Sequence, residues 1–309
     1  MALIRRTLLA ASTNPWLRDR AMKAPFVRRA VSRFMPGETT DAAIAAARAL
    51  QARGITTILT RLGENLDTTA AFEEVTTHYL DLLDRIASAQ LDAQISIKPT
   101  QLGLDLDPAL CERNLVRLVE RSDERHNFVW IDMESSAYVE RTIGLFRKMR
   151  ALTPNVGLAI QAYLYRSEKD LEALLPLGVA IRIVKGAYLE PPDLAYPAKS
   201  DVDANFFRLC TRVLEDAAGG GGGHLHIATH DTALAARLSA WIAERGVSRE
   251  RFEFAMLYGI QRGQQDRLAA AGTRLRVLIS YGEHWFPWYM RRLAERPANV
   301  MFALRQIIG

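Results

Sequence analysis

The amino-acid sequence predicts an α/β protein with the (β/α)8 TIM-type barrel fold, with extra N-terminal helices packed on or beside the barrel. Eight short apolar, β-branched runs recur between residues 55 and 279, roughly 25–40 residues apart. A helix-like stretch lies between most of them, as eight strand–helix units in ~250 residues require. The runs are continuously apolar, which is typical of parallel strands buried on both faces. A doubly wound sheet is the rival, but its first strand would more often lead into a glycine-rich turn.

The predicted elements follow one another from residue 40. A helical stretch at 40–52 ends at Gly54, and the turn after the first strand, Thr60–Gly63, has no GxGxxG pattern. Five glycines at 219–223 precede a strand, so we expect a flexible helix-to-strand loop there. The predicted strands are Ile55–Leu59, Ile95–Ile97, Phe128–Ile131, Val156–Ile160, Val179–Val184, Leu225–Ala228, Phe252–Leu257 and Leu275–Ile279. The predicted helices after the first are Thr68–Ala89, Pro108–Arg121, Ser136–Leu152, Glu168–Leu175, Asp201–Ala218, Thr232–Arg245, Gly263–Ala271 and Trp285–Arg296.

Residues 1–38 are predicted to form basic amphipathic helices, and residues 39–309 the catalytic barrel. The first 36 residues hold eight basic side chains and one acid, whereas the whole chain has a net charge of +5. Apolar residues in this segment recur at spacings of three, four and seven. Three interpretations stay open: helices packed on the barrel, peripheral contact with an anionic membrane surface, or a targeting peptide. Because the positive charge is not on the body, no nucleic-acid binding is expected.

Composition excludes several classes of protein. The chain has 309 residues, of which 49% are hydrophobic and 24% charged, near the globular average. It contains no run of ~18 apolar residues, so no membrane-spanning helix is expected. Cys111 and Cys210 are far apart and lack metal-type spacing, which argues against a disulfide scaffold or a zinc ribbon. A cytoplasmic location fits best, with the inner face of the cytoplasmic membrane as the site of any peripheral association.

Polar side chains gather at the carboxyl ends of the predicted strands. Barrel enzymes place their active sites at that end. Burying so many charges would be costly without a function. Cations dominate, which indicates an anionic ligand, an electron-rich cofactor, or both. The strand-end residues are Lys98, Asp132, Gln161, Arg182, Lys185 and His230.

The last predicted helix adds a pair of arginines to this end of the barrel. Trp288, Arg291, Arg292 and Glu295 are spaced three, four and seven apart, so they share one helix face. Adjacent arginines suit bidentate binding of a carboxylate or phosphate. Glu295 can pair with either arginine and fix its geometry. The alternative is a solvated arginine pair, which is common on helices.

A metal site is a competing hypothesis. His224, His226 and His230 cluster around one strand, and Asp231 follows them. The first two lie at the amino end of the strand, away from the mouth, so metal catalysis is not favoured. No serine or cysteine has an evident nucleophile context, and no G-x-S-x-G occurs.

Taken in order, the strand-end strings resemble the proline dehydrogenase family of flavin-dependent barrel enzymes, and most closely its short monofunctional bacterial members. The likeness covers nearly the whole chain, and several ordered motifs at matching spacing are specific. The matching strings are Ser96–Gly103, Ile131–Glu134, Gln161–Arg166, Arg182–Tyr188, Ala228–Asp231, Phe252–Phe254 and Arg291–Glu295.

The resemblance implies a role for each matching residue. Asp132 and Arg182 are implied to be catalytic, Asp132 by orienting Lys98 and Arg182 by stabilising negative charge on the flavin. Substrate contacts are implied for Lys98, Tyr188, Leu278, Trp288, Arg291, Arg292 and Glu295. Contacts with FAD are implied for Met133, Gln161, Arg182, Lys185, Gly186, Ala187, Thr229 and His230.

The resemblance also implies the reaction and its partners. L-proline would lose a hydride from ring carbon C5 to flavin N5 of FAD, giving 1-pyrroline-5-carboxylate. Electrons would pass to a membrane quinone, which gives residues 1–36 a task at the membrane surface. A partner enzyme that consumes the unstable product is conceivable, although nothing in the sequence identifies one.

Three positions depart from the family pattern. Leu278 and Trp288 stand where the family usually has tyrosines beside the proline ring, and Ala255 stands where a glutamine is common. Losing two hydroxyls makes the predicted pocket more apolar. This leaves two alternatives open: an FAD-dependent dehydrogenase of another cyclic amino acid such as hydroxyproline, or a non-catalytic amino-acid-binding barrel.

Overall fold

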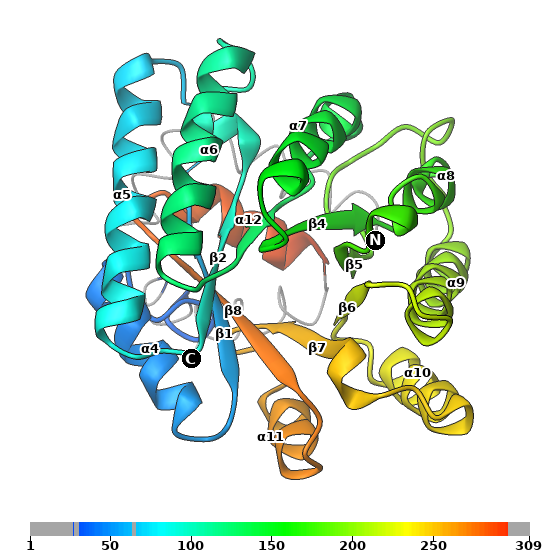
Figure 1. Cartoon of the computed structure of the whole chain (residues 1–309). Coiled ribbons are helices and arrows are strands. Elements are labelled where there is room, and N and C mark those ends of the chain that lie inside the picture. Colours follow the sequence, from blue (N-terminus) through cyan, green and yellow to red (C-terminus); the bar gives the residue numbers. More distant parts are fainter. Residues whose placement is uncertain (1–26, 28–30, 64–65, 296–309) are drawn as a thin grey trace.

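A closed barrel of eight parallel strands forms the centre of the molecule, so the predicted fold class is confirmed (Figure 1). The computed structural model describes residue 27, residues 31–63 and residues 66–295, the last five of these as backbone only. Each strand pairs with the next along the chain, and the eighth closes on the first. The strands are β1 (Thr56–Arg61), β2 (Ala93–Ile97), β3 (Val129–Ile131), β4 (Val156–Gln161), β5 (Ala180–Val184), β6 (His224–Ala228), β7 (Phe252–Leu257) and β8 (Leu275–Tyr281).

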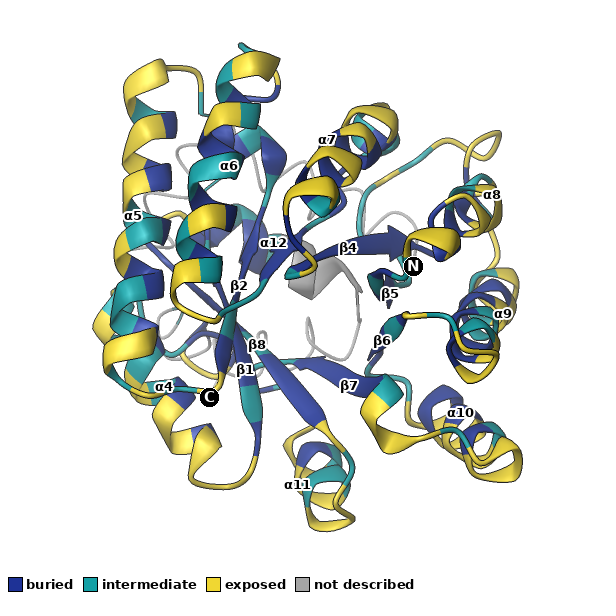
Figure 2. Cartoon of the chain, in the orientation of Figure 1, coloured by how far each residue is buried: buried dark blue, intermediate teal, exposed yellow. Residues whose placement is uncertain are grey.

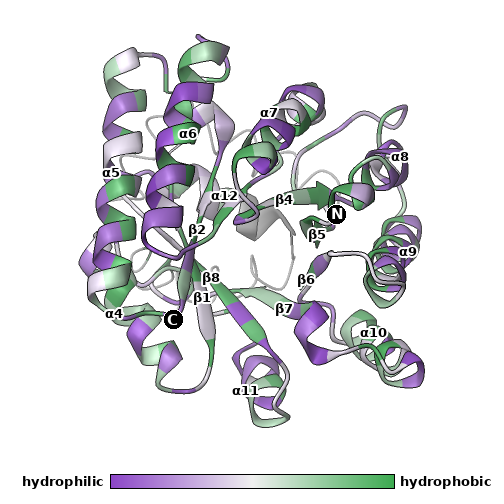
Figure 3. Ribbon diagram, in the orientation of Figure 1, coloured by the Kyte–Doolittle hydropathy of each residue, from purple (hydrophilic) through white to green (hydrophobic). Residues whose placement is uncertain are grey.

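Helices alternate with the strands and surround the barrel (Figure 1). They turn buried faces toward the strands and exposed faces outward (Figure 2), and hydrophobic and hydrophilic residues alternate along them (Figure 3). The α-helices are α4 (Thr40–Gln51), α5 (Thr69–Ser88), α6 (Pro108–Glu124), α7 (Val139–Leu152), α8 (Ser167–Glu172), α9 (Lys199–Ala218), α10 (Thr232–Arg245), α11 (Arg262–Ala270) and α12 (Trp285–Glu295). Short 3-10 segments are η1 (Pro99–Leu102), η2 (Ser136–Tyr138), η3 (Leu175–Leu177) and η4 (Arg249–Arg251).

Local sequence explains where these helices begin and which face they bury. Thr68 precedes α5 and its side chain accepts a hydrogen bond from the Ala71 N–H, as N-cap residues do. Along α5 the buried residues Phe72, Val75 and Tyr79 recur at three- and four-residue spacing, which produces one apolar stripe. Most of the fold's apolar burial lies between such stripes and the outer faces of the strands.

The interior of the barrel differs from the aliphatic layers that are usual for this fold. Arg182 on β5 contacts Ser96 on β2, and these strands are not neighbours, so both side chains point inward. Strand alternation then places Trp130, the register partner of Ser96, and His226, the register partner of Arg182, on the same inner surface. The barrel therefore encloses a buried polar and charged interior.

A second apolar cluster joins the residues before α4 to α12. It contains Val31, Phe34, Met35, Leu62, Trp285, Phe286, Trp288 and Tyr289. The Trp285 indole N–H donates to Glu38 at 3.0 Å. The backbone of Arg33 lies so close to Gly259 that a side chain at that position would overlap it. The apolar cluster and the Trp285–Glu38 hydrogen bond thus join α12 to the segment that enters the barrel, and the close approach at Gly259 joins the loop after β7 to the same segment.

The predicted elements are present, with small shifts in their bounds. The predicted helix Glu168–Leu175 is instead α8 followed by η3, because Pro176 has no N–H to continue a helix. The five glycines do connect α9 to β6. Of the predicted helical segment 1–38, residues 1–26 and 28–30 lie outside the described residues; Val27 and Val31 are helical, and residues 32–38 contain turns and bends but no helix. Among the described residues, no helix combines the length and apolar character needed to span a membrane.

Candidate active site

Lys98, Asp132 and Arg182 meet at the carboxyl end of the barrel, as the strand-end pattern predicts. Lys98 follows β2, Asp132 follows β3, and Arg182 comes from β5. The Lys98 Nζ atom lies 3.2 Å from Asp132 Oδ2, and Arg182 Nη2 pairs with Asp132 Oδ1. Two cations therefore share one carboxylate.

Ser96 completes this cluster from beneath. Its hydroxyl donates to Asp132 Oδ1 at 2.9 Å and accepts from Arg182 Nη2 at 2.9 Å. The Asp132 backbone N–H donates to the Ile97 carbonyl at 2.8 Å, which extends the β2–β3 pairing and fixes where the carboxylate stands. The four side chains form one hydrogen-bonded group.

The cations keep Asp132 ionised. Burial by itself would raise the pKa of the Asp132 carboxyl, but the charges of Lys98 and Arg182 and the Ser96 hydroxyl outweigh burial and hold it below its ordinary value. Asp132 is therefore a fixed negative charge that orients its neighbours, and it is poorly suited to carry a proton near neutral pH.

Two buried polar atoms in this region have no hydrogen-bond partner among the described residues. One is Arg182 Nη1, on a side chain only 4% exposed. The other is Gln161 Oε1, whose own amide donates to the Met133 carbonyl at 3.4 Å. Unsatisfied buried groups are rare and commonly mark the place of a ligand or water. Here a donor and an acceptor are both left unpaired.

Lys185 is the second cation of the predicted cofactor set, and two carboxylates hold it. Its Nζ atom lies 2.5 Å from Asp203 Oδ1 and 3.2 Å from Asp231 Oδ2. Lys199 contacts both carboxylates as well. Burial would raise the pKa of Asp231, but hydrogen bonds from Lys199, the Leu234 N–H and Lys185 lower it far below its ordinary value.

The segment after Lys185 is shaped by close packing on Tyr163. Gly186 has a φ of 112°, and a side chain there would overlap the Tyr163 ring. Ala187 and Tyr188 follow and are half-buried. Glu190 then ties the segment to η2 by accepting from the Ser136 N–H at 2.7 Å and its hydroxyl at 2.5 Å.

Thr229 and His230 lie at the end of β6. Thr229 is buried, and its hydroxyl accepts from the Asp231 N–H at 3.1 Å. His230 Nε2 accepts from the Leu257 N–H at 2.8 Å, so this nitrogen carries no proton. Both residues are thus at the mouth, next to β7.

The two residues that depart from the family pattern occupy different surroundings. Leu278 is half-buried on β8, in register with Ile58 and Leu257. Trp288 is buried in the second apolar cluster on α12. Arg291, Arg292 and Glu295 belong to α12 as predicted, but their side chains lie outside the described residues.

The histidines do not form one group. His224 and His226 lie with Glu253 at the amino end of the barrel, where their donor atoms fall within 4.8 Å of one another. Glu253 is already paired with Arg276 at 2.8 Å and Arg274 at 2.5 Å. Because these guanidiniums neutralise the carboxylate and repel a cation, the group does not favour a metal ion.

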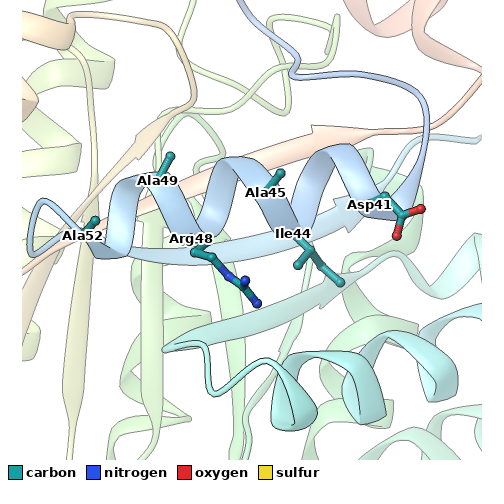
Figure 4. A pocket seen from close by; sticks show the side chains of 6 residues that line it. All are labelled: Asp41, Ile44, Ala45, Arg48, Ala49 and Ala52. Atoms are coloured by element: carbon teal, nitrogen blue, oxygen red, sulfur yellow. The ribbon is translucent and has the colours of Figure 1, made fainter.

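A shallow groove on the outer face of α4 is separate from the mouth (Figure 4). It has a volume of about 480 Å³ and involves none of the strand-end residues. Its lining is mostly small and apolar, namely Asp41, Ile44, Ala45, Arg48, Ala49 and Ala52. The groove offers no chemistry comparable to that of the mouth.

Sequence reasoning missed several contributors to the site. Ser96 and Trp130 could have been found, because each stands two residues before a predicted site residue on the same strand face. Glu190 and Asp203 carried no such signal, since a long loop and a helix bring them to the mouth.

Comparisons with known proteins identify the family of the chain. A family model described as proline dehydrogenase matches residues 43–305. "Proline dehydrogenase 2" of Bacillus subtilis subsp. natto is 34% identical over 278 residues, covering 90% of both chains. "Proline dehydrogenase" of Deinococcus radiodurans is 34% identical over 311 residues, covering 99% of this chain and 98% of its own.

Solved structures show the same fold. The proline utilization A protein of Bdellovibrio bacteriovorus aligns with a TM-score of 0.80 and 21% identity over 87% of this chain. That of Corynebacterium freiburgense aligns with a TM-score of 0.76 and 23% identity over 99% of this chain. The chain spans about a third of the length of these larger proteins, at 32% and 34%. From the family model and the relatives of similar length, the chain belongs to the proline dehydrogenase family.

Proposed function

We propose that this protein oxidises L-proline to 1-pyrroline-5-carboxylate with FAD as its cofactor. The observation that carries the proposal is the ion-paired cluster at the mouth of the barrel, in which half-buried Lys98 and buried Arg182 share the carboxylate of Asp132. It offers cations for a carboxylate substrate and a guanidinium N–H that no described residue satisfies.

The residues of the mouth fit a flavin. An isoalloxazine ring presents hydrogen-bond acceptors and one N–H donor along its edge, which match the unpaired Arg182 Nη1 and Gln161 Oε1. When bound, FAD would supply the two-electron chemistry by accepting a hydride. The residues that would hold it are Met133, Gln161, Arg182, Lys185, Gly186, Ala187, Thr229 and His230.

The protein's own part is to bind and orient. Lys98, Arg291 and Arg292 would bind the substrate carboxylate, with Glu295 supporting the arginines. Arg182 would place a fixed positive charge where negative charge grows during the reaction. Tyr188, Leu278 and Trp288 would line the ring of the substrate. Asp132 would keep Lys98 and Arg182 in place and remain ionised throughout.

We further propose that electrons leave to a membrane quinone and that residues 1–36 make peripheral contact with the cytoplasmic face of the membrane. The eight basic and several apolar residues of this segment support that proposal. Removing residues 1–36 should abolish association with anionic liposomes in a flotation assay. Unchanged flotation of the shortened protein would contradict it.

Oxidation of another cyclic amino acid, such as hydroxyproline, is the second candidate function. The observation that raises this candidate is that Leu278 and Trp288 replace the tyrosines expected beside the ring, which changes the shape and polarity of the pocket. A ring hydroxyl on the substrate needs a polar partner when buried. Proline stays the first choice because an apolar pocket suits its unsubstituted ring.

The test is anaerobic addition of L-proline to the purified protein. We expect visible flavin bands that bleach on addition, together with formation of the product. Bleaching by a different cyclic amino acid alone would reassign the substrate. Absence of flavin even after adding FAD would overturn the proposal and favour a non-catalytic binding barrel.

A further inference from the structure

Trp130 lies directly beneath Arg182 inside the barrel. The Arg182 Cζ atom is 4.9 Å from the centre of the indole ring, and Trp130 is 1% exposed. At this distance a cation over an aromatic face is attracted by the ring, most strongly where water is excluded. Arg182 is thus held by Asp132 and Ser96 along one edge and by Trp130 against its face.

Three contacts hold the indole itself in place. Its N–H donates to Gln94 Oε1 at 2.7 Å, and its ring centre is 4.3 Å from that of His226. On β4 its register partner is Gly157, where an added Cβ would lie 2.6 Å from Trp130 Cζ3. The ring therefore occupies the space that a side chain on Gly157 would take.

His226 adds no positive charge below the ring. Burial lowers its pKa well below the ordinary value, and nearby cationic groups lower it further. His226 is consequently a neutral neighbour near pH 7, and Arg182 is the cation that faces the indole.

We propose that Trp130 is a positioning residue that fixes the plane of the Arg182 guanidinium so that Nη1 points to the bound cofactor. This inference rests on the proposed function, because it assigns the ligand of Nη1 to the flavin. Trp130 is not a catalytic residue, since it acts through Arg182. A merely structural aromatic would fill the core without governing the direction of Nη1.

The test compares Trp130→Phe, which keeps an aromatic face, with Trp130→Leu, which removes it. Phe206→Leu is the matched control, because Phe206 is equally buried but lies on α9 in the outer core. Crystal structures of the three variants report the position of Arg182. The consequence of any movement of Arg182 is measured in four quantities: the flavin midpoint potential, the thermal midpoint, and KM and kcat for L-proline.

We expect Trp130→Leu to move the Arg182 guanidinium. We also expect the protein's preference for binding reduced rather than oxidised flavin to weaken about tenfold. For a two-electron couple that equals a drop of about 30 mV. In Trp130→Leu the rate of flavin reduction should fall with little change in KM. Trp130→Phe should restore most of the flavin potential and most of the reduction rate. Phe206→Leu should lower thermal stability alone.

Two outcomes would overturn the inference. One is an unmoved Arg182 guanidinium in the Trp130→Leu crystal structure. The other is a potential shift in Phe206→Leu as large as that in Trp130→Leu. Failure of the proposed function is distinguishable, because it appears in the unmodified protein as absence of flavin or of bleaching. The crystal structures decide the position of Arg182 in either case.

Discussion

Asp132 is the residue on which the geometry of the mouth depends, because both Lys98 and Arg182 contact its carboxylate. Removing one partner of a buried ion pair leaves the others uncompensated and costs about 3–5 kcal/mol. Ser96 would stay in place but would lose an acceptor. The whole cluster therefore responds to a single change at this position.

Asp132→Asn should lower kcat for L-proline by about 100-fold, because Lys98 and Arg182 lose the charge that orients them. Steady-state turnover with an artificial electron acceptor measures this. Glu140→Gln is the matched control: Glu140 pairs with Arg166 at 2.7 Å on the surface, and this variant should retain normal turnover. Turnover of Asp132→Asn within twofold of the unmodified protein would contradict the assigned role.

The same carboxylate predicts a pH dependence of stability. Its pKa in the folded state lies below the ordinary value of 3.8, so its stabilising contribution is complete above about pH 4 and is lost as pH falls through the folded value. The unmodified protein and Asp132→Asn should differ in free energy of unfolding by about the same amount at every pH from 5 to 8. This difference should narrow only in stronger acid. A difference that disappears between pH 5 and 8 would refute this account.

At the scale of secondary-structure elements, the contact between α5 and β8 contains a group whose protonation depends on pH. His78 Nε2 lies 2.7 Å from the Tyr281 hydroxyl. Burial, aided by Arg61, lowers the pKa of His78 to about 4 from its ordinary value of 6.5. The folded protein thus keeps His78 neutral where the unfolded chain would protonate it.

His78→Gln should lose less free energy of unfolding in mild acid than the unmodified protein does. A folded-state pKa below the unfolded one means that stability is lost as pH falls from about 6.5 to 4, since the unfolded state binds the proton. Chemical denaturation at pH 7 and pH 4.5 measures the effect. The loss between these pH values should be smaller in His78→Gln. An equal loss in both proteins would show that other groups cause it.

The segment between β5 and α9 makes a second element-scale prediction. Gly186→Ala should impair FAD binding, because alanine would have to adopt a φ near 112° and overlap Tyr163. Strain of this kind costs of order 1–3 kcal/mol. Gly220→Ala is the control: Gly220 has a φ of 97° but nothing within 4 Å. Titration of the two variants with FAD should show weakened binding for Gly186→Ala alone.

At the scale of the whole molecule, regular spacing of apolar runs was enough to predict the barrel. Strands such as Val156–Gln161 are buried on both faces and read as continuous apolar runs, and the polar residues that end each strand necessarily meet at one mouth. Lys98, Asp132 and Arg182 could be placed together for that reason.

Other parts of the site could not be predicted from local sequence. Glu190 reaches Ser136 across 54 positions of the chain, and Lys185 meets Asp203 because α9 packs where it does. Such contacts depend on tertiary packing rather than on the period of a strand or helix. The assignment of Arg291 and Arg292 to the substrate carboxylate remains a prediction.

The measurement that tests the central claim most directly is a crystal structure of the protein with FAD and a cyclic carboxylic acid that lacks the ring nitrogen and so cannot be oxidised. We predict that the carboxylate contacts Lys98, Arg291 and Arg292, and that Arg182 Nη1 donates to the flavin. A carboxylate bound elsewhere, or a flavin that leaves Arg182 Nη1 unpaired, would contradict the assignment of this mouth as the site of proline oxidation.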